Sequence, residues 1–241
     1  MKPHLRTRLE APMRAVAVLV AVLLVAMLLA FPAAVRGDEL ARTLTQATRQ
    51  QFIAPAAGSY RLQVIAQAPK GVVQDTDGRA YSLERYTRGK ITLLSFMYTY
   101  CTDAIGCPLA FITLHGLRER LLTNPALARQ VRFVSLSFDP VNDTPEAMQR
   151  YAGHLSDSTS LLRWHFLTTS SVQQLKPIID ELGQSVQVQR DSQGKPGRLY
   201  NHMLKMFLLD TKGRVREIYS SAFLQGDVML NDVKTLALEP R

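Results

Sequence analysis

The chain is 241 residues long, which is enough for one domain that buries its own core together with a targeting or anchoring segment. Hydrophobic residues make up 46% and charged residues 20%, the composition of an ordinary globular protein rather than of a small scaffold held together by disulfides. The net charge is +9, but five of the 29 basic residues fall within residues 1–36, which contain one acidic residue. The remainder carries 24 basic and 19 acidic residues, with no basic block, so the charge does not indicate a nucleic-acid-binding protein.

A basic segment followed by a long apolar one opens the chain. Residues 1–14 contain four basic residues, and residues 15–35 form an uncharged run of 21 residues. About 20 helical residues span a bilayer core, and an excess of basic residues before the run predicts a cytoplasmic amino terminus with the rest on the periplasmic side. The alternative is a cleaved signal peptide that leaves a soluble periplasmic protein. Apolar cores of signal peptides are usually about 7–15 residues long, so the length favours a single-pass membrane anchor.

Residues 36–58 are predicted to form a tether, and residues 59–241 an α/β domain. We expect its first strands at 79–83 and 90–96. The second of these is a near-continuous apolar run, typical of a central strand covered on both faces. Both cysteines lie in the loop that follows, and apolar residues then recur at helical spacing from Pro108 to about Leu122.

The alternation of strands and helices continues to the carboxyl end. Further strands are expected at 131–138, 163–167, 203–209 and 215–219, and further helices at 145–155, 170–182 and 226–238. Residues 189–201, rich in Gly, Ser and Pro, are predicted to be a loop, and residues 210–213 a hairpin turn. This order predicts a three-layer domain with a mixed central sheet and is compatible with the thioredoxin class.

Cys101 and Cys107 are the chain's two cysteines, and they lie between a predicted buried strand and the start of a predicted helix. The unpaired N–H groups and dipole of a helix start stabilise a thiolate. Three interpretations follow: a structural disulfide, thiol–disulfide exchange, or copper binding. Exchange usually goes with a two-residue spacer, which this pair lacks. Two thiolates and an imidazole would make a soft, low-coordinate site suited to Cu(I).

His202 is the candidate for the imidazole, because it stands at the edge of the predicted strand 203–209, a position that can face a strand-to-helix loop. His115 would lie about 12 Å beyond the second cysteine along the same helix, too far to share a metal ion. His154 and His165 flank a short predicted strand. A lone histidine is more often structural than a ligand, so these residues by themselves leave all three interpretations open.

Three motifs follow one another in a fixed order. The first is FMYTYC at 96–101 with Cys107-Pro108, the second is SFDPVNDTPE at 137–146, and the third is NHMLKMFLLDTKG at 201–213. In order and spacing, across roughly residues 71–219, they resemble the signature of the Sco/SenC family. Three ordered motifs are far more specific than any one of them.

The resemblance implies a thioredoxin-like fold anchored at the membrane, with two cysteines and a histidine that bind copper for delivery to the binuclear copper centre of cytochrome c oxidase. The ligands carried over are Cys101, Cys107 and His202, holding one ion as Cu(I) or Cu(II). Asp139 matches an acidic position of the family, and we expect it at most to support the ligands from behind without binding the ion itself. The implied partner is an apo copper enzyme subunit, and the protein would act as a copper chaperone rather than as an enzyme.

The spacing of the cysteines departs from the family pattern. The family usually separates them by three residues, whereas five, 102–106, intervene here. A longer loop can still bring both sulfurs to one ion, and Gly106 supplies flexibility. The alternative function is an exported thiol–disulfide oxidoreductase that reduces client cysteines through the Cys101–Cys107 pair. Reductases of this fold typically place a cis-proline before the strand that faces the cysteines, and Asn201-His202 stands there instead, which favours a metal.

Overall fold

A computed structural model describes residues 53–102 and 106–240 of the chain. The predicted basic segment, the predicted apolar segment 15–35 and most of the predicted tether lie outside these residues. Within the part that is described, no helix is both long and apolar enough to cross a membrane. Residues 55–58 of the predicted tether bind the last helix, since Asn231 Nδ2 donates to the Pro55 carbonyl (2.9 Å) and the Gly58 amide donates to Thr235 Oγ1 (3.0 Å).

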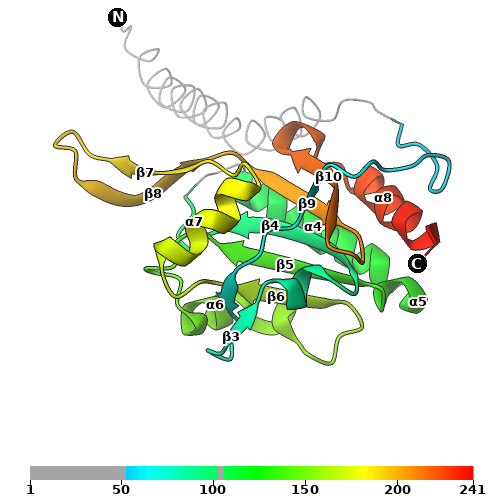
Figure 1. The fold of residues 1–241 in the computed structure, drawn as a ribbon, viewed down its shortest axis with the longest axis horizontal. Coiled ribbons are helices and arrows are strands. Elements are labelled where there is room, and N and C mark those ends of the chain that lie inside the picture. The colour runs from blue at the N-terminus through cyan, green and yellow to red at the C-terminus, as the bar shows by residue number, and fades with distance from the viewer. Residues whose placement is uncertain (1–52, 103–105, 241) are drawn as a thin grey trace, which may run out of the picture. The chain divides into compact units, whose positions relative to one another are not determined.

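The centre of the domain is a six-stranded mixed sheet in the order β1-β10-β9-β4-β5-β6 (Figure 1). Its strands are β1 (Ala66–Gln67), β4 (Ile91–Met97), β5 (Val131–Ser137), β6 (Arg163–Leu167), β9 (Lys205–Leu209) and β10 (Arg214–Ser220). β4, β5 and β6 are parallel, whereas β9 runs antiparallel to β4 and pairs with β10 through a tight turn. Gly213 closes that turn at φ +75°, a conformation that glycine adopts without a steric penalty.

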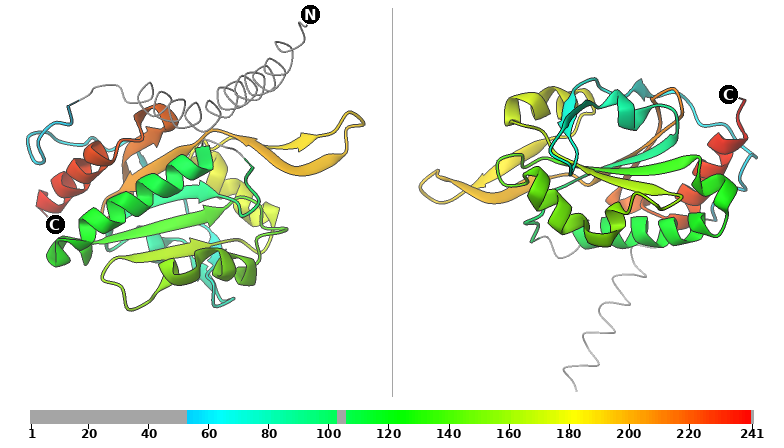
Figure 2. Two further views of the ribbon diagram at one scale, coloured as in Figure 1. Left: turned by 180° about the vertical axis from the view of Figure 1, so that it is seen from behind. Right: turned by 90° about the horizontal axis from the view of Figure 1, so that it is seen from below.

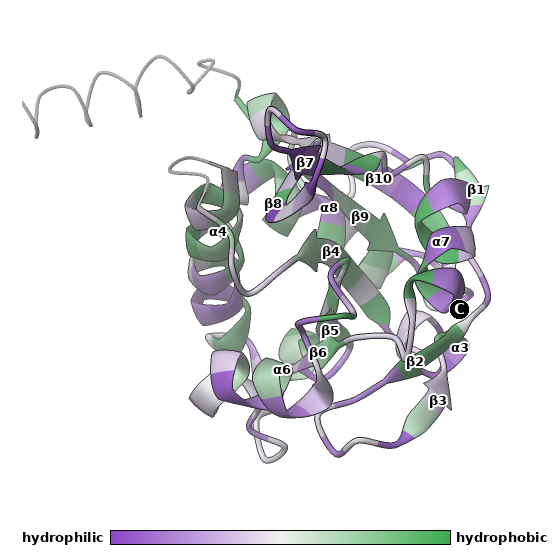
Figure 3. Ribbon diagram, turned by 90° about the vertical axis from the view of Figure 1, so that its left-hand side faces the viewer, coloured by the Kyte–Doolittle hydropathy of each residue, from purple (hydrophilic) through white to green (hydrophobic). Residues whose placement is uncertain are grey.

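Helices cover both faces of the sheet, which makes the domain three layers deep (Figures 2 and 3). The first face carries α4 (Gly106–Leu122), α5 (Pro125–Ala128), α6 (Pro145–Ala152) and α8 (Gly226–Leu238). The second carries α3 (Glu84–Thr87) and α7 (Val172–Glu181). Each face has its own buried apolar cluster, so β4 is buried on both sides, as its continuous apolar sequence predicts.

Most predicted elements are present, and their caps explain where they begin. Thr144 Oγ1 accepts from the Ala147 amide, and Pro145 occupies the first turn of α6, which begins at the predicted residue. α6 is shorter than predicted, however, because Gly153 ends it at φ +51° and a 3-10 turn (Gly153–Ser156) follows. A second 3-10 turn (Ser221–Phe223) links β10 to α8.

Two separate hairpins complete the fold, β2 (Val72–Gln74) with β3 (Ala80–Ser82) and β7 (Val186–Arg190) with β8 (Pro196–His202). The prediction of a loop at 189–201 is therefore wrong. β7 and β8 project from the sheet as a ribbon (Figures 1 and 2) and are largely exposed on both faces, so no alternation of apolar and polar residues marks them. The Gly- and Ser-containing stretch that suggested a loop is the tip of the hairpin, where the Asp191 amide donates to the Lys195 carbonyl (3.0 Å).

Candidate metal centre

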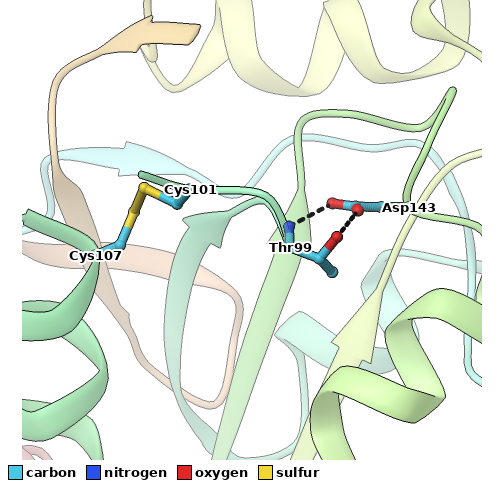
Figure 4. Close-up of a disulfide and its surroundings, with 4 residues drawn as sticks. All are labelled: Thr99, Cys101, Cys107 and Asp143. Atoms are coloured by element: carbon cyan, nitrogen blue, oxygen red, sulfur yellow. Dashed lines mark hydrogen bonds between the residues drawn. A yellow bond between two sulfur atoms is a disulfide. The ribbon is translucent and has the colours of Figure 1, made fainter. Parts of the chain in front are cut away.

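The two cysteines lie at the carboxyl end of the central strand. Cys101 is four residues beyond Met97, the last residue of β4, and Cys107 is the second residue of α4. Their sulfurs form a disulfide, with the two Cα atoms 6.7 Å apart (Figure 4). Both side chains are partly buried, and Cys107 borders the start of a helix whose dipole favours a thiolate once the pair is reduced. The structure therefore shows the oxidised state of this pair.

A buried carboxylate fixes the chain that leads into the cysteines. Asp143, 1% exposed, accepts from the Thr99 amide at Oδ2 (3.0 Å) and from the Thr99 hydroxyl at Oδ1 (Figure 4). Ser137 Oγ at the end of β5 also donates to Oδ2 of this carboxylate. The approach to Cys101 is thus tied to the neighbouring parallel strand and to the turn before α6.

β8 brings the histidine to the same place. Side chains two residues apart on a strand point to the same face, and Arg198, Tyr200 and His202 occupy such alternate positions of β8. The Arg198 guanidinium lies 4.3 Å from the centre of the Tyr100 ring, one residue before Cys101. This face of the hairpin therefore contacts the cysteine loop.

Aromatic rings surround the imidazole. The His202 ring centre lies 4.7 Å from that of Phe138 and 6.1 Å from that of Tyr98. Tyr200 packs edge-on against both of these rings, at 5.4 Å and 5.2 Å. Because aromatic contacts of this kind restrict ring orientation, the imidazole is held by the protein before any ion binds.

Asp139 lies behind this aromatic cluster rather than in front of the cysteines. Its carboxylate, 1% exposed, accepts from Tyr200 Oη at Oδ1 (3.0 Å) and from Asn142 Nδ2 at both Oδ1 (3.0 Å) and Oδ2 (2.8 Å). Burial and the bond to Asp139 raise the pKa of Tyr200, so its hydroxyl stays protonated and remains a donor. Asp139 thereby fixes the Tyr200 ring, which packs against the two aromatic neighbours of His202.

The fold brings all three predicted ligands together. One sulfur each from Cys101 and Cys107 and one ring nitrogen of His202 lie within 4.8 Å of one another. Among the residues that the structure describes, this is the one group of three such side chains close enough to hold an ion. His115 instead lies beside Phe111 on α4, with the ring centres 6.2 Å apart. His165 lies within β6, where its Nδ1 faces Asp75 at 3.3 Å, rather than flanking the strand.

The donor set fits a soft metal ion, provided that the disulfide is first reduced. A cavity of about 40 Å³ lies between the sheet and α4, and its lining includes Cys107, His202, Phe111 and Trp164. The apolar wall excludes water on one side of the group, while the partial exposure of the three donors leaves the other side accessible. Two sulfurs and one imidazole suit Cu(I) in a site of low coordination number.

The sequence did not single out the residues that support this group. They are Tyr98, Thr99, Phe138, Asp143 and Tyr200. Asp143 and Phe138 stand inside the second of the three motifs, so the motif itself was a signal for them. The period-two spacing of Tyr200 and His202 would have been a signal too, once residues 196–202 were known to form a strand.

Fold and site together define a thioredoxin-like domain with a Cys–Cys–His group at the end of its central strand. The family model SCO1/SenC matches residues 72–238, which include every residue of this group, and the chain belongs to that family. A "SCO1 protein homolog" of Bacillus subtilis (strain 168) is 26% identical over 163 residues, covering 67% of this chain and 78% of that protein.

Solved structures share the fold. Arabidopsis thaliana ScoI with copper bound is 20% identical, with a TM-score of 0.58 over 71% of this chain and 98% of that one. BsSco, a member of the Sco family of cytochrome c oxidase assembly proteins in which a disulfide switch has been identified, is 22% identical, with a TM-score of 0.55 over 74% of this chain and 99% of that one. These likenesses support the thioredoxin-like arrangement of sheet and helices.

Proposed function

We propose that reduced Cys101, Cys107 and His202 bind one copper ion, as Cu(I) or Cu(II), and pass it to an apo copper enzyme subunit such as that of cytochrome c oxidase. The observation that carries this proposal is the convergence of two sulfurs and one imidazole nitrogen within 4.8 Å. The three side chains come from a loop, a helix and a hairpin, so the group exists only in the folded domain.

Reduction has to precede binding. An external dithiol reductant gives two electrons and two protons to the disulfide, which becomes two thiols while the reductant becomes a disulfide. Copper then displaces the thiol protons as the sulfurs become ligands. The five intervening residues allow the sulfurs to come within bonding distance of each other, so they also allow both to reach one ion. Copper is the cargo here, and the protein's part is to hold it in a partly exposed place from which a client's ligands can take it over.

Family membership supports the identity of cargo and client. ScoI of Arabidopsis thaliana was solved with copper bound, and BsSco belongs to a family of cytochrome c oxidase assembly proteins. The matched region of the family model spans both cysteines and the histidine. We propose the same cargo and class of client for this chain.

A second function is favoured by the disulfide itself. Cys101 and Cys107 would act as a thiol–disulfide oxidoreductase when the reduced pair gives two electrons and two protons to a client's disulfide and ends as the bond seen here. The two functions differ in what the histidine does, because exchange needs the sulfurs alone. A reduction potential in the range of catalytic disulfides, unchanged in His202→Ala, would favour this alternative.

We further propose that the domain works on the periplasmic side of the cytoplasmic membrane, held by residues 15–35 as a single-pass anchor or released after their cleavage. The apolar run and the basic residues before it support this, and a disulfide is typical of an exported protein. A reporter enzyme that is active only after export, fused behind residue 241, tests the location. Absence of reporter activity would contradict it.

An anaerobic Cu(I) titration of the reduced chain against a competing chelator tests the copper proposal. We expect one tightly bound ion per chain and a loss of at least about tenfold in affinity, or about 1.4 kcal/mol, in Cys101→Ser, Cys107→Ser and His202→Ala. His154→Ala is the matched control, since His154 is exposed and lies outside the group. Equal copper affinity in the unchanged chain and the three variants would disprove the proposal and leave the cysteine pair as a redox couple.

A further inference from the structure

A polar cavity lies at the amino ends of the parallel strands, whereas the cysteines lie at the carboxyl end of β4. Its volume is about 300 Å³, and its lining includes Asp75, Arg85, Lys90, Arg132, Arg163 and His165. Lys90 immediately precedes β4, whereas Cys101 follows the carboxyl end of that strand. The cavity is therefore separate from the Cys–Cys–His group, and the inference drawn from it does not depend on the copper proposal.

Parallel strands bring its cations together. Arg132, the second residue of β5, is in register with Arg163, the first residue of β6. Lys90 is next to the first residue of β4, on the other side of β5. Like charges at directly paired positions of a sheet are destabilising, so Arg132 and Arg163 oppose folding here unless a negative group balances them. Lys90 adds a third positive group beside this pair.

The protein's own carboxylates do not balance them. Among the described residues, none of Lys90, Arg132 and Arg163 forms an ion pair with a carboxylate. The two acidic side chains of the cavity are bound by other groups. Asp75 accepts from Tyr86 Oη (2.8 Å) and faces His165, and the neighbouring Asp77 accepts from a tyrosine hydroxyl.

Only some of the N–H donors of the Arg132 guanidinium have hydrogen-bond acceptors. Its Nη1 donates to the Arg85 carbonyl (2.6 Å) and its Nη2 to the Arg88 carbonyl at the end of α3. Its Nε is buried and has no hydrogen-bond partner within the described residues. A buried donor without an acceptor destabilises the folded protein, and an anion in the cavity would supply an acceptor.

The electrostatics of the cavity agree with this geometry. Burial, and then the nearby charges of Arg132 and Arg163, lower the pKa of Lys90. Burial, and then Arg163, lower the pKa of Arg132 to about 10. The direction of both shifts shows that the surroundings of the two groups disfavour the positive charge, and at a pKa of about 10 Arg132 is still positive at neutral pH. A bound anion would remove that penalty.

We propose that this cavity binds an oxyanion of the phosphate class, either free phosphate or the phosphomonoester headgroup of a lipid. Four basic side chains against two carboxylates leave an excess of two positive charges, which matches a phosphate dianion. Lys90 and Arg163 have N–H groups available for it, and arginine and lysine are the usual phosphate ligands in proteins. A tetrahedral oxyanion offers acceptors in several directions, as donors at or just before the starts of three neighbouring strands require.

Calorimetric titration of the oxidised full-length chain with inorganic phosphate, at pH 7.5 and low salt, tests the proposal. We expect saturable binding to one site, weakened about tenfold in Arg163→Gln and in Lys90→Gln, since each loses a charged hydrogen bond. Arg132 is left intact because it also binds the carbonyls of α3. Arg150→Gln is the matched control, because Arg150 is an exposed arginine of α6, a helix that follows the carboxyl end of β5, and it should bind phosphate as the unchanged chain does.

Two further arms identify the source of the phosphate. Glycerol 3-phosphate replaces free phosphate in one, and phosphatidylcholine vesicles with and without phosphatidic acid are used in the other. If the chain binds vesicles with phosphatidic acid more tightly than vesicles without it, and Arg163→Gln abolishes the difference, the ligand is a lipid headgroup. If the two kinds of vesicle bind equally, the ligand is a soluble phosphate. Phosphate that fails to saturate, or that binds Arg163→Gln and Arg150→Gln equally, overturns the proposal and leaves a solvated cluster of cations.

Discussion

At the scale of single residues, Asp143 determines how the chain reaches the cysteines. Its two oxygens together accept from the Thr99 amide, the Thr99 hydroxyl and the Ser137 hydroxyl. All three partners are donors, so the site requires two acceptor oxygens and no N–H group. A buried carboxylate that accepts several hydrogen bonds is costly to replace, because the donors left over have no water to bind.

We therefore expect Asp143→Asn to lower the free energy of unfolding by about 1–3 kcal/mol, since one acceptor oxygen becomes an NH₂ group that faces a donor. Copper affinity should fall as well, because Thr99 is two residues before Cys101. Urea denaturation of the oxidised protein measures the first effect. Asp180→Asn is the control, because its exposed pair with Lys176 on α7 contributes only about 0.3–0.5 kcal/mol. Equal destabilisation by the two substitutions would show that Asp143 does not fix the loop.

At the scale of elements, β8 contributes to the metal centre through only one of its two faces. Tyr200 and His202 point toward the cysteine loop, whereas Asn201 lies between them and bonds to Gln189 across the hairpin at 2.8 Å. Removal of Tyr200 would take away a donor to buried Asp139 and two aromatic contacts beside the imidazole. Removal of Asn201 would affect the exposed ribbon only.

Tyr200→Ala should thus lower the free energy of unfolding by about 1–3 kcal/mol and weaken copper binding, because the imidazole loses the ring that packs beside its aromatic neighbours. Asn201→Ala should change each by less than about 0.5 kcal/mol, as an exposed substitution does. Urea denaturation and the copper titration measure both variants. The assignment of faces would be wrong if Asn201→Ala were the more damaging of the two.

The elements that the sequence predicted are those in which local chemistry and burial agree. β4 and β5 are seven-residue strands that are almost wholly buried, β6 has the predicted bounds, and Thr144 caps α6. The β7–β8 hairpin was missed because its strands are solvated on both faces and therefore lack a periodic apolar pattern. A single sequence therefore reveals a strand through the apolar pattern that burial imposes, and it does not reveal a strand that is exposed on both faces.

The candidate site divides in the same way. Cys101, Cys107 and His202 could be named because their side chains have a chemistry of their own and stand in motifs that resemble a family. Of the residues behind them, the resemblance gave Asp139, but not its bond to Tyr200 or the roles of Thr99 and Asp143, because those arise from contacts across the fold. Thr99 and Asp143 are 44 residues apart in the chain, and Asp139 and Tyr200 are 61 apart. Such pairs are created by the sheet order, which a single sequence does not specify.

At the scale of the whole molecule, two bound carboxylates link stability to pH. Asp210, at the β9–β10 turn, accepts from Arg214 Nε (2.7 Å) and Arg216 Nη1 (3.1 Å). Burial would raise its pKa, but hydrogen bonds from Arg214, Arg216 and the Lys212 amide outweigh burial and hold the pKa below its usual value. Burial is likewise outweighed at Asp75, where His165, the Thr76 amide and Tyr86 lower the pKa.

Both groups have a folded-state pKa below the unfolded value of about 3.9. Their ionised forms therefore stabilise the protein fully at pH values above the unfolded pKa. This stabilisation is lost as the pH falls through the folded pKa. Stability should therefore be flat with respect to these two groups between about pH 5 and 7 and should decline below about pH 4. Urea denaturation of the oxidised protein at pH 7, 5, 4 and 3 measures the decline. Asp210→Asn should be less stable than the unchanged chain at pH 7, and the difference should narrow at pH 3, which lies below the unfolded pKa of the carboxylate. An equal difference at both pH values would show that the ionised form of Asp210 is not what its arginine partners stabilise.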